Sequence, residues 1–310
     1  MRYSLTQVRE VDATAVAQVR RFNRIVTQRV GALDEAFLAR GRPLGQARVL
    51  WEIGPDGAEL RALRERLGLD SGYLSRVLAA LAADGLVTIG PSVADGRVRT
   101  ARLTKAGLAE RAELDRRNDA VASSILDPLG EAQRERLVGA MADVERLLAA
   151  SMVGIGPCDP RHRHARTSLD AYFGELAARF EHGFDIERAN PDSPSDLVPP
   201  NGLLLVAVLA GEPVGCGVLR HHELHAGVPG WSEIKRLWVS PTVRGIGLGR
   251  RLLAELEHRA ASAGAPVVRL DTNRVLTEAI AMYRAEGYRE IAPFNDNPYA
   301  HHWFEKLLDR

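Results

Sequence analysis

A glycine-rich turn is the part of the sequence whose residue types point most directly to chemistry. It reads Arg244-Gly245-Ile246-Gly247-Leu248-Gly249-Arg250. A predicted β-strand, 233–239, precedes the turn, and an amphipathic segment typical of a helix, 248–263, follows it. Glycine lets the backbone turn sharply and approach a ligand closely, and the first N–H groups of a helix favour negative charge. The segment therefore predicts a site for a pyrophosphate group.

A dinucleotide-binding fold is the alternative use of such a turn. That fold expects an acidic residue about 20 residues after the glycines, and Asp271 follows Gly249 at a comparable spacing. The glycines here are spaced R-x-x-G-x-G, however, and not G-x-G-x-x-G. The strand before them also follows a predicted hairpin, whereas a dinucleotide site uses the first strand of its domain. Both differences argue against a dinucleotide site.

The elements around the turn predict a mixed α/β domain. Two apolar segments, 203–209 and 214–220, flank Gly211-Glu212-Pro213 and predict a β-hairpin. The other predicted elements are helix 167–180, strand 233–239, helix 248–263, strand 267–272, helix 277–285 and two closing strands, 288–293 and 302–307.

Two motifs in this domain resemble those of the GNAT N-acetyltransferase superfamily. The first is R-x-x-G-x-G after a strand that ends V-x-P, and the second is a helix with the pattern A-x-x-x-Y-x-x-x-G-[FY]. The matching residues are Val239, Pro241, Arg244, Gly247, Gly249, Ala279, Tyr283, Gly287 and Tyr288. The resemblance covers residues 166–310 and implies a GNAT fold with a central mixed sheet. It also implies acetyl transfer from acetyl-CoA to an amine, which requires no metal.

The resemblance implies a role for several residues. Backbone groups of Leu237, Trp238 and Val239 would hold the pantetheine arm and the acetyl oxygen, and the turn Arg244–Arg250 would hold the pyrophosphate. Tyr283 would protonate the leaving thiolate, or else be a core aromatic residue. Glu233 would act as the base, or else be a solvated carboxylate at a strand end. Asn273 would bond the CoA arm, or else form a turn; the family's usual asparagine three residues before Ala279 is Leu276 here.

A polar and aromatic segment near the C-terminus predicts a wall of the acceptor pocket. We expect Asn295, Asp296, Asn297 and Tyr299 to face the substrate, and a surface loop is the alternative. His221, His222 and His225 lie close together in the sequence, but no cysteine or carboxylate cluster joins them. We therefore expect a solvated hairpin end there and no metal site.

The N-terminal half predicts a helix-turn-helix. Segments 59–67 and 71–84 are amphipathic, Gly68 is suited to end the first helix, and Asp70 is suited to cap the second. Leu74, Val77, Leu78 and Leu81 would pack inward. We predict that the residues left facing DNA near the helix start are Ser71, Tyr73, Ser75 and Arg76. Predicted strands 86–90 and 98–103 enclose a wing with Arg97 near its tip. Arg97 would enter a minor groove, or else be an exposed charge of the hairpin.

This half resembles the MarR family of transcriptional regulators. Asp95-Gly-Arg97 and Leu103-Thr104-x-x-Gly107 are similar to that family's wing and to its following helix entry, and Arg48–Ile53 resembles its second helix. The resemblance implies double-stranded operator DNA as a partner. It also implies a homodimer formed through terminal helices, here 11–38 and 131–150. The order of the two halves resembles MarR–GNAT fusion proteins.

Composition fits two domains in one cytoplasmic chain. The 310 residues suffice for two domains, and we predict them at 1–150 and 166–310, with a Gly- and Pro-containing linker at 151–165. No apolar run approaches the length of a membrane span, and no signal peptide is recognisable. Two cysteines exclude a disulfide framework. The net charge is +1, with basic residues in excess only in the first half.

Three functions are compatible with this organisation. The first is a bifunctional protein that binds DNA and acetylates a primary amine of a small molecule or protein. The second is a transcriptional regulator whose GNAT domain only senses acyl-CoA or a small amine. The third is an acetyltransferase whose winged helix only mediates dimerisation. The presence of Tyr283 and Glu233 favours the first over the second, and Arg76 and Arg97 favour it over the third.

Overall fold

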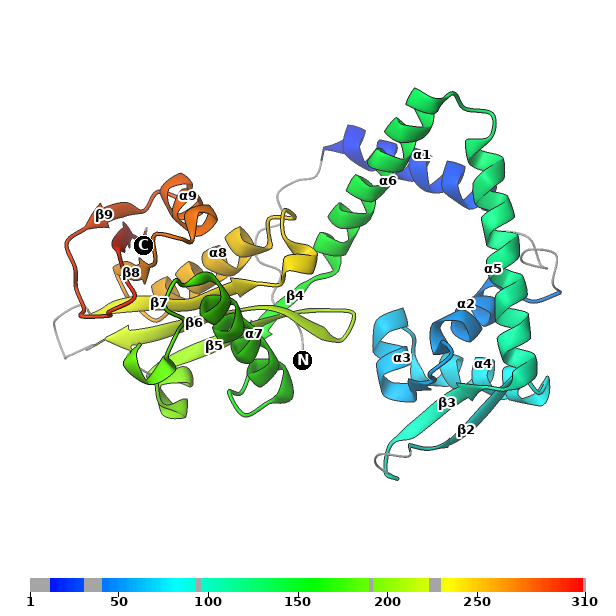
Figure 1. The fold of residues 1–310 in the computed structure, drawn as a ribbon, viewed down its shortest axis with the longest axis horizontal. Helices are drawn as coiled ribbons and strands as arrows, with labels where there is room; N and C mark the ends of the chain where they lie inside the picture. The colour runs from blue at the N-terminus through cyan, green and yellow to red at the C-terminus, as the bar shows by residue number, and fades with distance from the viewer. Residues whose placement is uncertain (1–11, 31–40, 93–95, 190–191, 223–229, 309–310) are drawn as a thin grey trace. The chain divides into compact units, whose positions relative to one another are not determined.

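The chain consists of two compact units, Met1–Gly139 and Ala140–Arg310, which are coloured along the sequence in Figure 1. This computed structural model describes residues 12–30, 41–92, 96–189, 192–222 and 230–308. The division falls within helix α6 (Glu131–Met152), which contributes residues to both units. The predicted boundaries at 150 and 166 remain predictions.

The first unit is helical with a small antiparallel sheet, as the sequence predicts for a winged helix-turn-helix. The sheet has the order β1-β3-β2. Its strands are β1 (Ala58–Glu59), β2 (Val87–Pro91) and β3 (Arg99–Leu103). The helices before α6 are α1 (Ala13–Arg29), α2 (Leu44–Ile53), α3 (Leu60–Leu67), α4 (Ser71–Ala83) and α5 (Lys105–Leu126). Of the predicted helix 11–38, residues 11 and 31–38 lie outside the described residues.

Local sequence signals fix the ends of these helices. Gly68 ends α3 in the left-handed conformation, with φ 62°. The Asp70 carboxylate accepts from the backbone N–H of Tyr73 at 2.8 Å and caps α4. Thr104 caps α5 by accepting from the Gly107 N–H at 3.0 Å, and Gly107 lies against the Leu86 carbonyl with no room for a side chain. The L-T-x-x-G pattern therefore has a packing reason, because only glycine allows this approach.

The second unit is built on a seven-stranded sheet of order β4-β5-β6-β7-β8-β10-β9. All neighbours are antiparallel except β7 and β8, which are parallel. The strands are β4 (Gly154–Pro157), β5 (Gly202–Leu209), β6 (Glu212–His222), β7 (Trp231–Val239), β8 (Val267–Thr272), β9 (Arg289–Ile291) and β10 (His302–Leu307). This is the mixed sheet that the sequence predicts.

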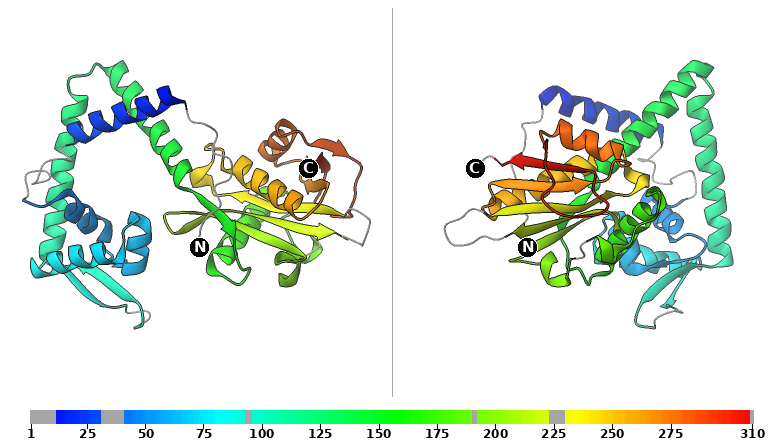
Figure 2. Two further views of the ribbon diagram at one scale, coloured as in Figure 1. Left: turned by 180° about the vertical axis from the view of Figure 1, so that it is seen from behind. Right: turned by 60° about the vertical axis from the view of Figure 1, so that its left-hand side comes forward.

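Helices cover both faces of this sheet (Figure 2). The α-helices of this unit after α6 are α7 (Arg163–Arg179), α8 (Leu248–Ser262) and α9 (Thr277–Ala285). Successive side chains of a strand point to opposite faces. Leu205 and Ala207 accordingly pack in the cluster that contains α8 and α9, and Leu204 and Val206 pack in the cluster that contains Ala165 of α7. Because both faces of β5 are buried, its sequence is continuously apolar and does not alternate.

A strand replaces part of the predicted linker. Residues 154–157 form β4, which pairs antiparallel with β5 from Gly154↔Val208 to Pro157↔Leu205, and α7 already begins at Arg163. The linker prediction was therefore wrong for these residues. The Gly-Ile-Gly-Pro sequence has no alternating apolar pattern that would have predicted a strand. An edge strand is held through its backbone on one side only, which is why glycine and proline are tolerated there. No helix in the described part of the chain is long and apolar enough to cross a membrane.

Candidate functional site

A gap between β7 and β8 creates the site. The two parallel strands pair only at Ser232↔Val268 and Glu233↔Arg269, although β7 continues to Val239 and β8 to Thr272. Their later residues therefore diverge, and the backbone groups along that side of β7 are available to a ligand. Such a split between neighbouring strands is a common place for ligands to bind in an α/β sheet.

A β-bulge in β7 lies at this split. Val218 pairs with Lys235 and Cys216 with Trp238, so two residues of β7, Arg236 and Leu237, stand opposite one residue of β6. Arg236 has a positive φ of 52°, a conformation that is uncommon for a residue other than glycine. Bulges of this kind redirect backbone and side-chain groups beside binding sites.

A cleft of about 710 Å³ lies along the diverging end of β7 and the start of α8. Most residues predicted to bind the cofactor line it. They are Leu237, Trp238, Val239, Arg244, Gly245, Gly247, Leu248, Gly249 and Arg250. Ile246 does not line the cleft, because its side chain packs against the hydrophobic core. Asn273 does not line it either.

The glycine-rich turn is shaped to present its N–H groups. Gly245 and Gly247 have positive φ values of 81° and 78°, which other residues adopt only with strain. Gly247 is the N-cap of α8, a 15-residue helix. The unpaired N–H groups of the first turn of α8 and the positive end of its dipole therefore favour an anion here. The turn and the cleft fit a ligand that carries a pyrophosphate.

Arg244 links the end of β7 to α7 at one side of the cleft. Its guanidinium donates to the Glu175 carboxylate at 2.5 Å and to the Val239 carbonyl at 3.0 Å. Glu175, on α7, also accepts from the Trp238 indole N–H at 2.8 Å. Burial raises the pKa of Glu175, but the hydrogen bonds from Trp238 and Arg244 outweigh burial and hold that pKa below its ordinary value. Glu175 therefore remains a carboxylate that links α7 to the end of β7.

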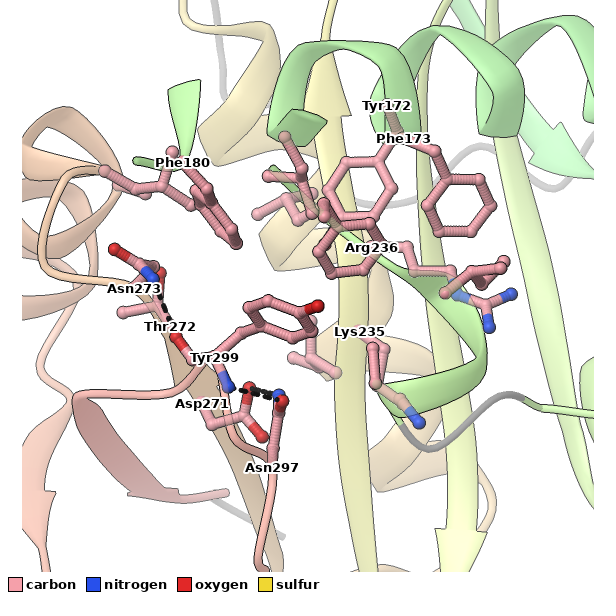
Figure 3. Close-up of a pocket in the computed structure, with 18 of the residues that line it drawn as sticks. Tyr172, Phe173, Phe180, Lys235, Arg236, Asp271, Thr272, Asn273, Asn297 and Tyr299 are labelled. Carbon is pink, nitrogen blue, oxygen red and sulfur yellow. Dashed lines mark hydrogen bonds between the residues drawn. The ribbon is translucent and has the colours of Figure 1, made fainter. Parts of the chain in front are cut away.

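A second, smaller cavity of about 100 Å³ adjoins the cleft (Figure 3). Six residues line both cavities: Tyr172, Leu176, Leu237, Leu276, Ala279 and Tyr283. The smaller cavity also contains Lys235, Arg236, Asp271 and Asn273, and six of its lining residues are aromatic. A molecule in the cleft and a second molecule in this pocket would therefore meet near Tyr283.

Tyr283 is well placed for a role where the cavities meet. It is 6% exposed, and its ring contacts those of Tyr288 and Phe304. Burial and the nearby charge of Asp271 raise the pKa of the Tyr283 hydroxyl above its ordinary value. Among the residues that the structure describes, none forms a hydrogen bond with this hydroxyl. A protonated hydroxyl of this kind can donate to a group that develops negative charge.

Glu233 lies outside both cavities. Its carboxylate accepts from, or pairs with, His222 Nε2 at 2.8 Å, and it is 5% exposed. The His222 ring stacks on Trp231 at 4.0 Å between centroids. The structure therefore gives Glu233 a local partner, and Glu233 lines neither cavity. His225 lies outside the described residues, and no group of three potential metal ligands is found in the part of the chain that is described.

The C-terminal segment forms part of the pocket wall, but only some of the predicted residues face the cavity. Asn297 and Tyr299 line it, whereas Asn295 and Asp296 do not. Asn295 instead lies behind the wall, where it donates to Asp271 and accepts from the Trp303 indole. Asn273 donates to the Tyr299 carbonyl at 2.7 Å and accepts from Val275 N–H at 3.1 Å. Asn273 thus holds the wall in place, and the turn-forming alternative describes its contacts.

The predicted DNA-facing residues divide into two sets. Ser71, Ser75 and Arg76 are exposed on α4, and Arg97 is exposed beside the wing tip. Tyr73 differs from the prediction, because it is half-buried and packs against the core of the unit. Its hydroxyl lies over Gly45 of α2, where a Cβ would come within 2.2 Å of it. The reason is helical spacing, since position 73 lies one turn before buried Val77. Residues 93–95 of the wing lie outside the described residues.

Two features of the site carried no recognisable signal in the sequence. The aromatic walls come from positions 172–184 and 299, which are far apart in the chain. Asp271 was considered only as a dinucleotide residue, yet it lines the pocket. A search for acidic residues at the end of β8, next to the split, would have found Asp271.

Comparison with known proteins agrees with both halves of this description. The Acetyltransferase (GNAT) family matches residues 169–288, and the MarR family matches residues 40–98. An "IAA acetyltransferase" of Azospirillum brasilense is 36% identical over 132 residues, which are 42% of this chain and 77% of that protein. The chain belongs to the GNAT acetyltransferase family. It carries a MarR domain and a GNAT N-acetyltransferase domain, and the GNAT fold uses acyl-CoA.

Parts of the chain are also similar to a second N-acetyltransferase and to a solved structure. An "aminoalkylphosphonate N-acetyltransferase" of Salmonella typhimurium is 32% identical over 130 residues, covering 41% of this chain and 84% of that protein. A crystal structure of a MarR-family transcriptional regulator from Rhodococcus sp. RHA1 matches at 19% identity and a TM-score of 0.37. That match covers 44% of this chain and 96% of the regulator.

Proposed function

We propose that this protein is bifunctional: it transfers an acetyl group from acetyl-CoA to a primary amine, and it binds operator DNA as a homodimer. The observation that carries the first activity is the meeting of a large cleft and a small pocket at Tyr283. Two substrates can approach each other there while each keeps its own binding surface. Holding two reactants together in this way is a large part of catalysis.

The residues of the cleft divide the work of acetyl transfer. Acetyl-CoA supplies an acetyl group activated as a thioester. The turn from Arg244 to Arg250 binds the pyrophosphate through its N–H groups. The backbone of Leu237, Trp238 and Val239 binds the pantetheine arm and orients the acetyl oxygen. Tyr283 gives its proton to the departing sulfur.

A small molecule is the preferred acceptor. The pocket beside Tyr283 has a volume of only about 100 Å³, which is too small for a folded protein surface to enter except through a single side chain. The name of the Salmonella relative, an aminoalkylphosphonate N-acetyltransferase, supports a small aminated acceptor here as well.

The MarR domain provides the DNA-binding surface in this proposal. Ser71, Ser75 and Arg76 of α4 face the major groove, and Arg97 of the wing reaches a minor groove. Large apolar side chains are exposed along α1 and α6, among them Val19 at 57%, Ile25 at 62%, Met141 at 51% and Leu147 at 65%. An apolar face of this kind on a monomer marks an interface. A second copy of the chain is the proposed occupant.

Thiol release from acetyl-CoA tests the enzymatic half of this proposal. The purified protein is assayed with amino acids, polyamines and small amines. Release that depends on one class of acceptor establishes the activity and its substrate class. Binding of acetyl-CoA without release by any acceptor favours a regulator that senses acyl-CoA. In that case, operator affinity should differ when measured with and without acetyl-CoA, because sensing requires such a coupling.

A further inference from the structure

The small pocket is unusually aromatic for this chain. Phe, Trp and Tyr make up 5% of the sequence, yet Tyr172, Phe173, Phe180, Phe184 and Tyr299 surround this one cavity. Their rings form a continuous series, with centroids 5.9 Å apart for Phe173 and Phe184 and 4.9 Å apart for Phe184 and Tyr299. Aromatic faces attract organic cations, including ammonium groups. The Arg236 guanidinium already lies over Phe173, 5.3 Å from the ring centroid. Arg236 and Lys235 also line the cavity, and both are paired with Asp192. The other aromatic walls therefore suit a cationic acceptor.

A single carboxylate completes this surface. Asp271, near the end of β8, lines the pocket and is shown beside Asn297 in Figure 3. Asn295 donates to its Oδ2 at 2.6 Å, and Asn297 donates to its Oδ1 at 3.0 Å. No lysine or arginine of the described ranges forms an ion pair with it. The two amides fix its orientation without neutralising its charge, and each oxygen keeps a further lone pair to accept from a ligand.

The surroundings of Asp271 suit proton transfer. Burial raises the pKa of this carboxyl, the Asn295 amide opposes the rise, and the charge of Glu233 adds to it. A base whose pKa lies closer to the working pH transfers protons more effectively. The charge of Asp271 in turn contributes to the raised pKa of Tyr283. The carboxylate and the hydroxyl therefore act on each other across the same cavity.

The geometry points to Asp271 as the residue that binds the ammonium group of a compact primary alkylamine and takes its proton, an inference that rests on the acetyl transfer proposed above. Glu233, which the family resemblance suggested as the base, faces His222 and lines neither cavity. Asp271 lies in the same pocket as Tyr283. The proposed base thus lies within the acceptor pocket, and the proposed acid lies where that pocket meets the cleft.

The protons and bonds of this step balance. The alkylammonium gives one proton to the Asp271 carboxylate, and the neutral nitrogen forms a C–N bond to the acetyl carbon. The C–S bond breaks, and the sulfur takes the hydroxyl proton of Tyr283. After the C–N bond has formed, the nitrogen carries one proton more than an amide nitrogen. This proton passes to the Tyr283 oxygen, and Asp271 releases its proton to water. The products are the N-alkylacetamide, the free thiol and one proton.

The pocket volume limits the size of the acceptor. A cavity of about 150 Å³ holds benzene, and the volume here is about 100 Å³. The enclosed part of the acceptor is therefore smaller than a phenyl ring, as in a short alkylamine. An indole ring or a long polyamine would not be enclosed.

The test compares acceptors and variants of the full-length protein. The acceptors are n-propylamine and 2-aminoethylphosphonate as compact amines, and tryptamine and spermine as larger ones. The variants are Asp271→Asn, Asp271→Glu and Asp170→Asn, the last of which changes an exposed aspartate of α7 outside both cavities. Acetyl-CoA affinity confirms that each variant is folded. Calorimetric binding of the amine in the presence of CoA gives a readout that does not depend on turnover.

We expect the compact amines to be preferred and Asp271→Asn to lower kcat/KM by about 100-fold or more. The same variant should weaken amine binding at least about tenfold, and Asp170→Asn should do neither. Asp271→Glu keeps the carboxylate and should retain more activity than Asp271→Asn. The kcat/KM of the wild-type protein should not change with pH at pH values between the pKa of Asp271 and the pKa of the amine. In Asp271→Asn it should rise about tenfold per pH unit, because only free amine then reacts.

Other charged or titratable groups enter the interpretation of that profile. Lys235 and Arg236 of β7 and Tyr283 of α9 line the same pocket as Asp271, and the charge of Glu233 of β7 acts on Asp271 from outside the pocket. Full activity of Asp271→Asn with unchanged amine binding overturns the inference and leaves acetyl transfer itself standing. Acetylation of only the larger amines overturns the assigned substrate class. Absence of thiol release by the wild-type protein with every acceptor instead removes the proposed function.

Discussion

Replacing Tyr283 by phenylalanine removes one oxygen atom at the point where the two cavities meet. The ring remains packed against Tyr288 and Phe304, and no described residue loses a hydrogen bond. The residue lines both cavities, and removing its hydroxyl leaves no buried donor or acceptor of the described residues unsatisfied. We therefore expect Tyr283→Phe to change the free energy of unfolding by less than about 1 kcal/mol.

The effect on turnover should be much larger. A positioned general acid contributes about 10²–10⁴-fold to a rate, so we expect kcat to fall about 100-fold, which corresponds to about 2.7 kcal/mol of the barrier. Acetyl-CoA affinity should change less than about twofold, because the ring that lines the cleft remains.

Three measurements on one preparation check this reasoning. Thiol release at saturating acetyl-CoA gives kcat, calorimetry gives the acetyl-CoA Kd, and thermal denaturation gives the stability. Unchanged kcat would show that the hydroxyl is not the acid. A fall in kcat accompanied by an equal loss of stability or of acetyl-CoA affinity would show that Tyr283 only shapes the cleft. Only a selective loss of kcat supports proton donation.

Four further predictions concern both units. Because burial and Asp271 raise the pKa of Tyr283 above its ordinary value of 10.0, the acid stays protonated, and kcat should not decline below pH 10 in a pH–rate profile. Arg97→Ala should weaken operator binding and lower the slope of log K against log salt by about 1, while Arg259→Ala, in the other unit, should leave the slope unchanged; an unaltered slope for Arg97→Ala would remove the wing contact. Gly107→Ala should lower the stability of the first unit, because its Cβ would lie 2.1 Å from the Leu86 carbonyl oxygen. Gly139→Ala, which meets nothing within 4 Å in α6, should raise helix stability by about 1 kcal/mol, and equal shifts in thermal denaturation for the two variants would contradict this contrast. Ile25→Glu, on the exposed apolar side of α1, should shift the protein towards monomer in sedimentation, and an unchanged mass would exclude α1 from the dimer interface.

The secondary structure of the acetyltransferase unit was predictable because its signals are local. The predicted bounds of β8, α9 and β10 agree with the structure. Each of these elements has its own apolar period and is bounded by turn residues. Gly68, Asp70 and Thr104 likewise act within three residues of their own position. Signals of this range need no knowledge of the fold.

The errors occurred where a distant segment decides the outcome. Residues 154–157 form a strand only because their backbone pairs with β5 at the edge of the sheet. The Gly-Ile-Gly-Pro sequence itself does not predict this pairing. A local pattern could therefore not have predicted this strand. Tyr73 is an exception, because its spacing from buried Val77 is a local signal. Gly45 of α2 only leaves the space that the Tyr73 hydroxyl occupies.

The acceptor pocket shows the same limit for function. The pyrophosphate turn was recognisable because one short segment contains all of the residues that form it, with two glycines at positive φ at the start of a helix. The pocket is instead assembled from α7, β7, β8, α9 and the segment before β10. The split of β7 from β8 decides which of these side chains face one another. Glu233 belongs to the last residue pair before the split and remains among its neighbours, whereas Asp271 lies beyond it and faces the cavity. Strand pairing, more than residue type, therefore distinguishes the two carboxylates.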